Sequence, residues 1–236
     1  APELLHHGLT GLRRALDQHF HFDLILRLAE PHFGNLHLKR TLPACHRSAK
    51  FDDVTGLEHT DEFLGQIPVF CQDIVFSKSA RIRFFSSTPL ENIEATTHEA
   101  STFLNIQKGE IVFSMLIKSF RFEKALMEEH FNENYMESDR YPKAMFKGNI
   151  LNLQEIHFSK DGNYTARISG DLTIHGQSRK VEVQAKFIVK QGKLSGNSEF
   201  KIKPADYGIK IPSIVKGKIA EEIEVFVNSN YEPYKK

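Results

Sequence analysis

Residues 110–118 read Glu-Ile-Val-Phe-Ser-Met-Leu-Ile-Lys, and the alternation in this stretch decides the fold class. One face of it carries the apolar side chains of Ile111, Phe113, Met115 and Ile117. A period of two residues is typical of a β-strand that buries one face and leaves the other in solvent. We therefore interpret this stretch as a half-buried strand.

The same kind of signal recurs along the chain from residue 73 onward. Further candidate strands are residues 80–84, 93–97, 144–150, 151–158, 163–174, 180–190, 194–203 and 219–227. Asp161-Gly162 and Gln191-Gly192-Lys193 lie between strand pairs and are expected to supply the positive φ angles of hairpin turns. Eight or nine antiparallel strands of this length predict a single closed β-barrel.

One segment departs from the strand pattern and has the period of a helix. Residues 123–137 contain two rows at helical spacing: Leu126, His130 and Asn134 form one, and Met127, Phe131 and Tyr135 form the other. The sequence therefore predicts one helix in a β domain. We expect its Met-Phe-Tyr stripe to pack on the sheet or to plug one mouth of the barrel, and either placement is compatible with lining a ligand cavity.

The whole chain is nearly neutral, with 31 Lys and Arg residues against 30 Asp and Glu residues. No large positive surface is therefore expected to hold nucleic acid or an anionic membrane. The longest apolar runs fall far short of the roughly 20 residues that cross a bilayer, so no membrane-spanning segment is expected. The only two cysteines, Cys45 and Cys71, exclude a disulfide scaffold and leave open one bridge or two free thiols.

The composition changes sharply near residue 72. Residues 1–72 hold 8 of the 12 His, 5 Arg to 2 Lys and 13 Leu to 2 Ile, whereas residues 73–236 hold 6 Arg to 18 Lys and 8 Leu to 17 Ile. Arg and Lys are similar in polarity, and so are Leu and Ile. A difference in fold between the two parts therefore explains this change in composition poorly. We interpret residues 1–72 as a separate N-terminal segment, fused or disordered, and residues 73–236 as the β-barrel domain.

The N-terminal segment has a helical period in Leu5, Leu9, Leu12, Leu16 and Phe20, which predicts a short amphipathic helix. The rest of this segment has no clear period. Its histidines show neither the His-Glu-x-x-His spacing nor the paired Cys/His spacing of zinc sites, so no metal site is predicted there.

Several motifs in the β domain together resemble a known family. In chain order they are Ser119-Phe120-Arg121-Phe122, Glu129-His130-Phe131, Tyr141-Pro142-Lys143-Ala144 with Phe146-Lys147-Gly148, Asp171-Leu172-Thr173-Ile174-His175-Gly176, and Asp206-Tyr207-Gly208-Ile209. Their order and spacing resemble the YceI-like family of lipid- and polyisoprenoid-binding proteins, over about residues 74–232.

This resemblance implies a lipocalin-like fold, an eight-stranded antiparallel barrel with one helix, that holds a long isoprenoid chain without covalent attachment and without another cofactor. Members of the family are often exported by bacteria, which implies a periplasmic or otherwise exported protein. They often carry a signal peptide before the first strand. None is visible in this chain, but we hypothesise that Ile67-Pro68-Val69-Phe70-Cys71-Gln72 is the tail end of one. A homodimer is left open.

Catalytic motifs are mostly absent from the sequence. There is no Gly-x-Ser-x-Gly motif, no glycine-rich phosphate loop and no Gly-x-Gly-x-x-Gly motif. His130 lies three residues before Glu133, within reach on a helix, but we interpret it as a structural histidine. His175 is interpreted as a hydrogen-bonded residue of a strand. We therefore predict no catalytic residue, no metal ligand and no enzyme activity.

Binding of an apolar chain is the function that the β domain favours, because an eight-stranded barrel encloses room for side chains or for one slim ligand. The expected ligand is a polyisoprenoid or an isoprenoid quinone, held for transport or storage. The predicted lining residues are Phe84, Ile93, Phe113, Met115, Phe120, Phe122, Phe131, Phe146, Ile168 and Phe187. About half of them are expected to contact a ligand, and the rest to fill the core. Two alternatives stay open: a small-molecule enzyme that uses the same cavity, and a packed barrel that binds a protein.

We predict that residues 73–236, expressed alone, fold into the same β domain. The far-UV circular dichroism spectrum should be that of a β protein, and thermal unfolding should show one cooperative transition at the Tm of the β domain in the full chain. A shortened chain that fails to fold would instead show that residues 1–72 belong to the core.

Overall fold

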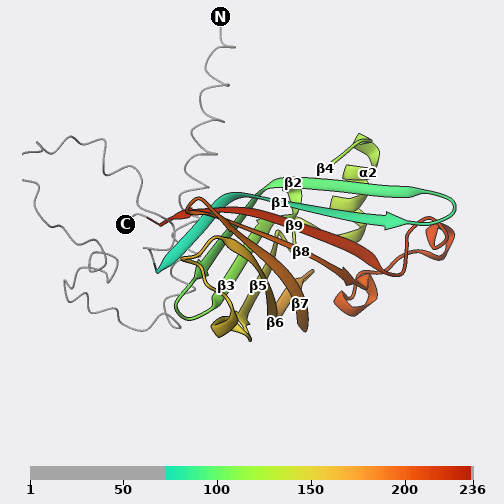
Figure 1. The fold of residues 1–236 in the computed structure, drawn as a ribbon. Coiled ribbons are helices and arrows are strands. Elements are labelled where there is room, and N and C mark those ends of the chain that lie inside the picture. Colours follow the sequence, from blue (N-terminus) through green and yellow to red (C-terminus); the bar gives the residue numbers. More distant parts are fainter. Residues whose placement is uncertain (1–72, 235–236) are drawn as a thin grey trace, which may run out of the picture. The chain divides into compact units, whose positions relative to one another are not determined.

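The computed structural model describes residues 73–234, in which nine strands build a closed antiparallel barrel (Figure 1). The eight strands of the ring are β1 (Ile74–Ser87), β2 (Asn92–Asn105), β3 (Glu110–Leu116), β5 (Lys143–Ile150), β6 (Gly162–Ile174), β7 (Gln177–Lys190), β8 (Lys193–Ile202) and β9 (Ile223–Pro233). This confirms the predicted eight-stranded antiparallel barrel. The predictions for residues 1–72, namely a separate segment, a short helix, no metal site and the state of both cysteines, lie outside the described residues.

The ring closes because β1 pairs with a strand on each of its sides. Phe84 of β1 lies opposite Ala95 of β2 and opposite Val225 of β9. The register on the β2 side shifts between Ser77 and Ala80, and such irregularities bend a strand and increase its twist. The curvature of β1 therefore lets it meet both neighbours, and the described ring has no open edge of the kind that invites aggregation.

The ninth strand, β4 (Arg121–Phe122), takes over from β3 beside β2. Residues 101–104 of β2 pair with β3, whereas Ala95 and Thr96 pair with β4. A 3-10 turn over Ile117–Ser119 separates β3 from β4 and ends the predicted strand of residues 110–118 earlier than its alternation suggests. The chain then continues from β4 into the helical segment.

The helical segment lies at one mouth of the barrel (Figure 1), as the sequence predicts. It is less regular than predicted, because α2 (Ala125–His130) continues as a π-helical turn over Phe131–Tyr135. None of its residues is fully buried. The predicted stripe of Met127, Phe131 and Tyr135 borders the barrel interior, so the segment is held over the mouth by that face.

Two hairpin predictions have different outcomes. Gln191 and Gly192 join β7 to β8 with φ angles of +51° and +71°, as the predicted turn requires. The prediction for Gly162 is wrong, because this residue begins β6 without a positive φ. Its neighbour Asp161 acts through its carboxylate, which accepts the backbone N–H of Gln191 at 3.1 Å.

The predicted strand over residues 151–158 is also wrong, because this stretch is a loop. The side chain of Asn152 holds the loop in place: its amide donates to the Thr165 carbonyl at 2.9 Å, and its oxygen accepts the Arg167 N–H at 2.8 Å. Phe158 still reaches the core and is 8% exposed. The apolar residues of this stretch therefore indicate burial, but they do not indicate that the stretch pairs with another strand.

Strand ends differ from the predictions elsewhere as well. β1 and β2 extend well beyond residues 80–84 and 93–97, because their far ends find partners in β9 and β3. β9 begins at Ile223, later than predicted, and residues 203–222 form a long loop between β8 and β9. The remaining 3-10 turns are Leu153–Glu155 beside Asn152 and, within the long loop, Pro204–Tyr207 and Ser213–Val215.

Side chains close the barrel at the end opposite α2. The turns between β2 and β3 and between β7 and β8 lie at this far end, and the residues beside them are packed tightly. Val75 and Leu104 are fully buried, Phe187 is 1% exposed and Leu194 is 3% exposed. The far end is thus a solid apolar core, and any open space must lie nearer to the helix.

We predict that Gly170→Ala destabilises the barrel strongly. Gly170 pairs with Gly148 across β6 and β5, and a Cβ at residue 170 would come within 2.3 Å of the Lys147 carbonyl oxygen. Such overpacking against the backbone should lower the free energy of unfolding by about 2 kcal/mol or more, measured by urea denaturation. Gly217→Ala is the control, because its Cβ would meet only the mobile end of the Leu90 side chain. Equal losses for both variants would contradict the prediction.

Candidate functional site

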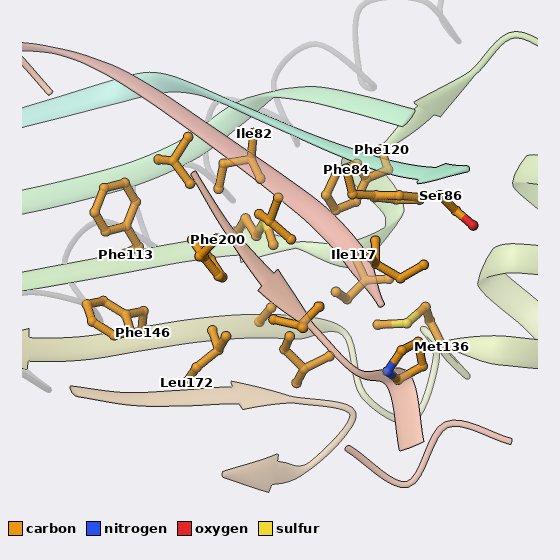
Figure 2. Close-up of a pocket in the computed structure, with 18 of the residues that line it drawn as sticks. Ile82, Phe84, Ser86, Phe113, Ile117, Phe120, Met136, Phe146, Leu172 and Phe200 are labelled. Atoms are coloured by element: carbon orange, nitrogen blue, oxygen red, sulfur yellow. The ribbon is translucent and has the colours of Figure 1, made fainter. Parts of the chain in front are cut away.

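A cavity of about 560 Å³ lies inside the barrel, between the packed far end and α2 (Figure 2). Figure 2 shows Phe113 and Phe146 toward one end of this space and Phe84, Phe120 and Met136 toward the other. Ligand sites in proteins commonly have volumes of about 300 to 1,000 Å³. The cavity therefore has the size of a small-molecule or lipid site.

The strands build the cavity wall by placing inward residues side by side. Phe113 of β3 pairs with Phe146 of β5, which in turn pairs with Leu172 of β6. Paired residues in a sheet point to the same face, so their side chains form a continuous row across neighbouring strands. On this side of the barrel the row is apolar throughout.

Small residues on another part of the wall explain why the interior is not filled. Ala185 of β7 pairs with Ser198 of β8, and Phe187 pairs with Gly196. All four border the cavity. A Cβ at residue 196 would lie 3.0 Å from the Phe187 ring, so the glycine leaves room for that ring beside β8. The space opposite the large aromatic side chains is thus left open.

The structure brings all ten predicted lining residues to this one cavity. They are Phe84, Ile93, Phe113, Met115, Phe120, Phe122, Phe131, Phe146, Ile168 and Phe187. Phe120, Ile168 and Phe187 are only 1–4% exposed and belong to the packed wall. The other seven are partly exposed, and their inward register turns that surface toward the cavity. Contact of any of them with a ligand stays a prediction.

Four phenylalanine rings form a cluster at the mouth and attach the helix to the barrel. Phe131 of the π-helical turn lies 5.0 Å from Phe122 of β4 and 5.4 Å from Phe84 of β1, measured between ring centroids. Phe120 completes the cluster, 5.2 Å from Phe84. Aromatic pairs at these separations contribute about 0.5–1.5 kcal/mol each beyond the area that they bury. The cluster therefore fixes the position of the helix over the mouth.

Sequence reasoning missed part of the cavity lining. On the strands, the missed residues include Ile82, Leu172, Phe200 and Val225, which occupy inward positions and could have been found by extending the alternation of each strand. The loop between β8 and β9 supplies a second missed group, Ile209, Ile211, Val215 and Ile219. These residues have no strand period, so no pattern in the sequence marks them as lining.

Charge is confined to the mouth of the cavity. The charged residues among the lining are Glu91, Lys124 and Lys218, and Lys124 lies 3.7 Å from Glu91 as an ion pair. At the far end the polar groups of the lining include the hydroxyls of Ser229 and Tyr231. Burial raises the pKa of Tyr231 to about 12, and the nearby Thr102 and Ser229 hydroxyls partly oppose this rise. The far wall is therefore uncharged at neutral pH.

The two histidines considered in the sequence lie in different settings. His130 is exposed on α2 at the cavity border, and within residues 73–234 it forms no ion pair with Glu133. His175 is a turn residue with a φ of +51°, not a strand residue as predicted. It is hydrogen-bonded, as predicted: its ring nitrogens lie 3.2 Å from the Tyr207 carbonyl and 3.3 Å from the Glu137 carboxylate.

Two further searches cover the described part of the chain. Between residues 73 and 234, no group of three His, Cys, Asp or Glu side chains is placed to hold a metal ion. In the same range, no helix is long and apolar enough to cross a membrane.

Comparison with known proteins agrees with the geometry. The sequence model of the YceI-like domain family matches residues 75–231 of this chain. The fold resembles a polyisoprenoid-binding domain from Saccharophagus degradans implicated in plant cell wall breakdown, with a TM-score of 0.60 and 14% identity, covering 69% of this chain and 99% of that one. It also resembles BcnA from Burkholderia cenocepacia, with a TM-score of 0.54 and 14% identity, covering 65% and 96%.

No curated protein matches the chain in sequence. The two structural likenesses lie at low identity and therefore show a shared fold. The family match spans most of the chain, and it covers every strand of the barrel and the helix. The β domain of this chain therefore belongs to the YceI-like domain family.

Proposed function

We propose that the β domain binds one long apolar lipid inside its barrel, a polyisoprenoid or an isoprenoid quinone, and carries or stores it. The observation that carries this proposal is a cavity of about 560 Å³ with an apolar wall and with charged residues only at its mouth. A polar or charged occupant would lose hydration in such a space and would find few polar partners there, which is costly. A slim hydrocarbon chain meets no such penalty.

Hydrocarbon burial alone can supply the affinity. Each methylene that leaves water contributes about 0.8 kcal/mol, so ten contribute roughly 8 kcal/mol. Association costs an estimated 4–15 kcal/mol in lost freedom, so a short chain would bind weakly. Affinity should therefore rise with chain length until the cavity is full, which favours long isoprenoids over small apolar molecules.

Family membership supports this ligand class. The Saccharophagus degradans relative in fold is described as a polyisoprenoid-binding domain. At 14% identity only the fold is shared, so the ligand assigned to this chain rests on the cavity itself. The exported character of the family also leads us to infer a periplasmic carrier, which would move or hold its lipid outside the cytoplasm.

The two alternative functions receive less support from the geometry. A barrel filled by its own side chains, acting only as a protein-binding surface, does not fit an interior with this much open space. An enzyme would need an acid or base held in place against the substrate. His130, the histidine that borders the cavity, is exposed rather than held by a carboxylate.

We predict that the full chain, purified without detergent, retains apolar lipid. Solvent extraction followed by mass spectrometry should find an isoprenoid or another long-chain lipid in near-stoichiometric amount. A protein sample denatured and refolded in the absence of lipid serves as the control and should yield none. Absence of any lipid from the native sample, and failure of the refolded sample to take up an added polyprenol, would reject the proposal.

Filling the cavity should block binding. Val183 points into the cavity from β7, whereas its neighbour Gln184 is exposed on the outer face. We predict that Val183→Trp weakens polyprenol binding by about tenfold, since it displaces roughly two buried methylenes. The natural chain has no tryptophan, so the fluorescence of the introduced ring also reports occupancy. Gln184→Trp is the matched control and should bind normally; equal weakening in both variants, at unchanged Tm, would contradict the assignment of the site.

A further inference from the structure

The most exposed large apolar side chains of the described residues lie together at the mouth. Ile214, in the loop between β8 and β9, is 89% exposed, and Leu90, in the turn between β1 and β2, is 73% exposed. A Cβ at Gly217 of the same loop would lie 3.2 Å from the Leu90 side chain, so loop and turn are in contact. Figure 1 shows the loop beside the tip of the β1–β2 hairpin. We call Leu90 and residues 208–220 the rim patch.

The sequence of the rim patch combines apolar and basic residues. Residues 209–219 read Ile-Lys-Ile-Pro-Ser-Ile-Val-Lys-Gly-Lys-Ile, and no Asp or Glu occurs between residues 208 and 220. No residue of this segment is fully buried. Lys216 lies 3.8 Å from Glu221, whereas Lys210 and Lys218 form no ion pair with any residue in the range 73–234. The patch thus presents apolar tips among positive charges.

The same loop also borders the cavity. Ile209, Ile211, Val215 and Ile219 are part of the cavity lining, while Ile214 points away into solvent. One face of the loop therefore lines the route into the barrel, and the other face is free. A molecule that leaves a surface in contact with Ile214 would reach the cavity along an apolar path.

We propose that the rim patch docks on a lipid bilayer that contains anionic headgroups and forms the port through which the lipid ligand passes. This inference rests on the proposed function, because a port is needed only if a lipid is carried. Lysines near an anionic bilayer are attracted to it, and exposed apolar side chains insert at the boundary between headgroups and acyl chains. A bilayer is also the phase in which a polyisoprenoid dissolves, so docking removes the need to cross water.

The charges on the other side of the mouth set the orientation. The helix exposes Leu126, which is 61% exposed. Arg121 pairs with Glu128 there at 2.9 Å, but Glu123 and Glu129 flank Leu126 with exposed carboxylates. An anionic surface repels these carboxylates and attracts the three lysines of the rim patch. The barrel should therefore dock with the loop and hairpin toward the bilayer and with α2 tilted away from it.

Vesicle flotation with the full chain tests the proposal. The protein should float with vesicles of phosphatidylcholine and phosphatidylglycerol, and less so as salt is raised, because salt screens exposed charges. Phosphatidylcholine vesicles alone should bind it more weakly. We expect Lys210→Gln with Lys216→Gln to weaken binding by roughly 25-fold, from about fivefold for each lysine. The matched control, Lys186→Gln with Lys190→Gln on β7, makes the same change in net charge and should bind like the unmodified chain.

The apolar contribution has its own pair of variants. Ile214→Ser should weaken vesicle binding by about tenfold, whereas Leu151→Ser, which removes a side chain that is 54% exposed at the far end, should leave it unchanged. Equal losses in these two variants, or a protein that stays in solution with both kinds of vesicle, would overturn the proposal. The second outcome would also be expected if the patch bound a protein instead.

Lipid extraction separates this proposal from the proposed function. Neither Ile214 nor Leu90 borders the cavity, so Ile214→Ser and Leu90→Ser should retain extractable lipid while they lose vesicle binding. A chain that holds lipid but never floats with vesicles would refute docking and leave the lipid-binding function intact. A chain that floats through the rim patch but holds no lipid would support docking and refute the lipid-binding function.

Discussion

The pairing of β1 with both β2 and β9 is the constraint on which the rest of the structure depends. It closes eight strands into a ring, and strand number and tilt then set the width of the interior. In a closed ring, alternate residues of every strand must point inward, and one strand cannot slide past its neighbour without disturbing the whole. The sizes of the inward side chains therefore decide where the barrel is solid and where it is hollow.

Those sizes change along the barrel axis. At the far end Val75, Leu104 and Phe187 fill the interior completely. Nearer to the mouth, Ala185 and Ser198 leave room opposite larger aromatic rings, and the cavity occupies that room. The phenylalanine cluster then holds the helix over the mouth of the barrel. One continuous apolar lining thus forms a solid core at one end and encloses the cavity at the other.

The mouth differs chemically on its two sides, and this difference links the two proposals. The helix side carries the exposed carboxylates of Glu123 and Glu129, while the loop side carries Lys210, Lys216 and Lys218. An uncharged interior selects an apolar occupant by shape and desolvation rather than by specific polar contacts. The charged rim decides what surface the barrel approaches and in which orientation. Selection of the ligand and selection of the docking surface are thus assigned to separate residues.

The sequence alone determined the fold class, the family resemblance, the presence of one helix and ten residues of the cavity wall, because a two-residue period reports locally which side chains face inward. The tertiary structure decided those features that leave no periodic pattern in the local sequence. Residues 151–158 are apolar but form a loop, because the side chain of Asn152 holds their backbone against β6. Ile209, Ile211, Val215 and Ile219 line the cavity because the loop that joins β8 to β9 lies at the mouth. The open volume itself lies between small residues of β7 and β8 and the aromatic side chains of strands far from them in sequence, such as Phe113 of β3.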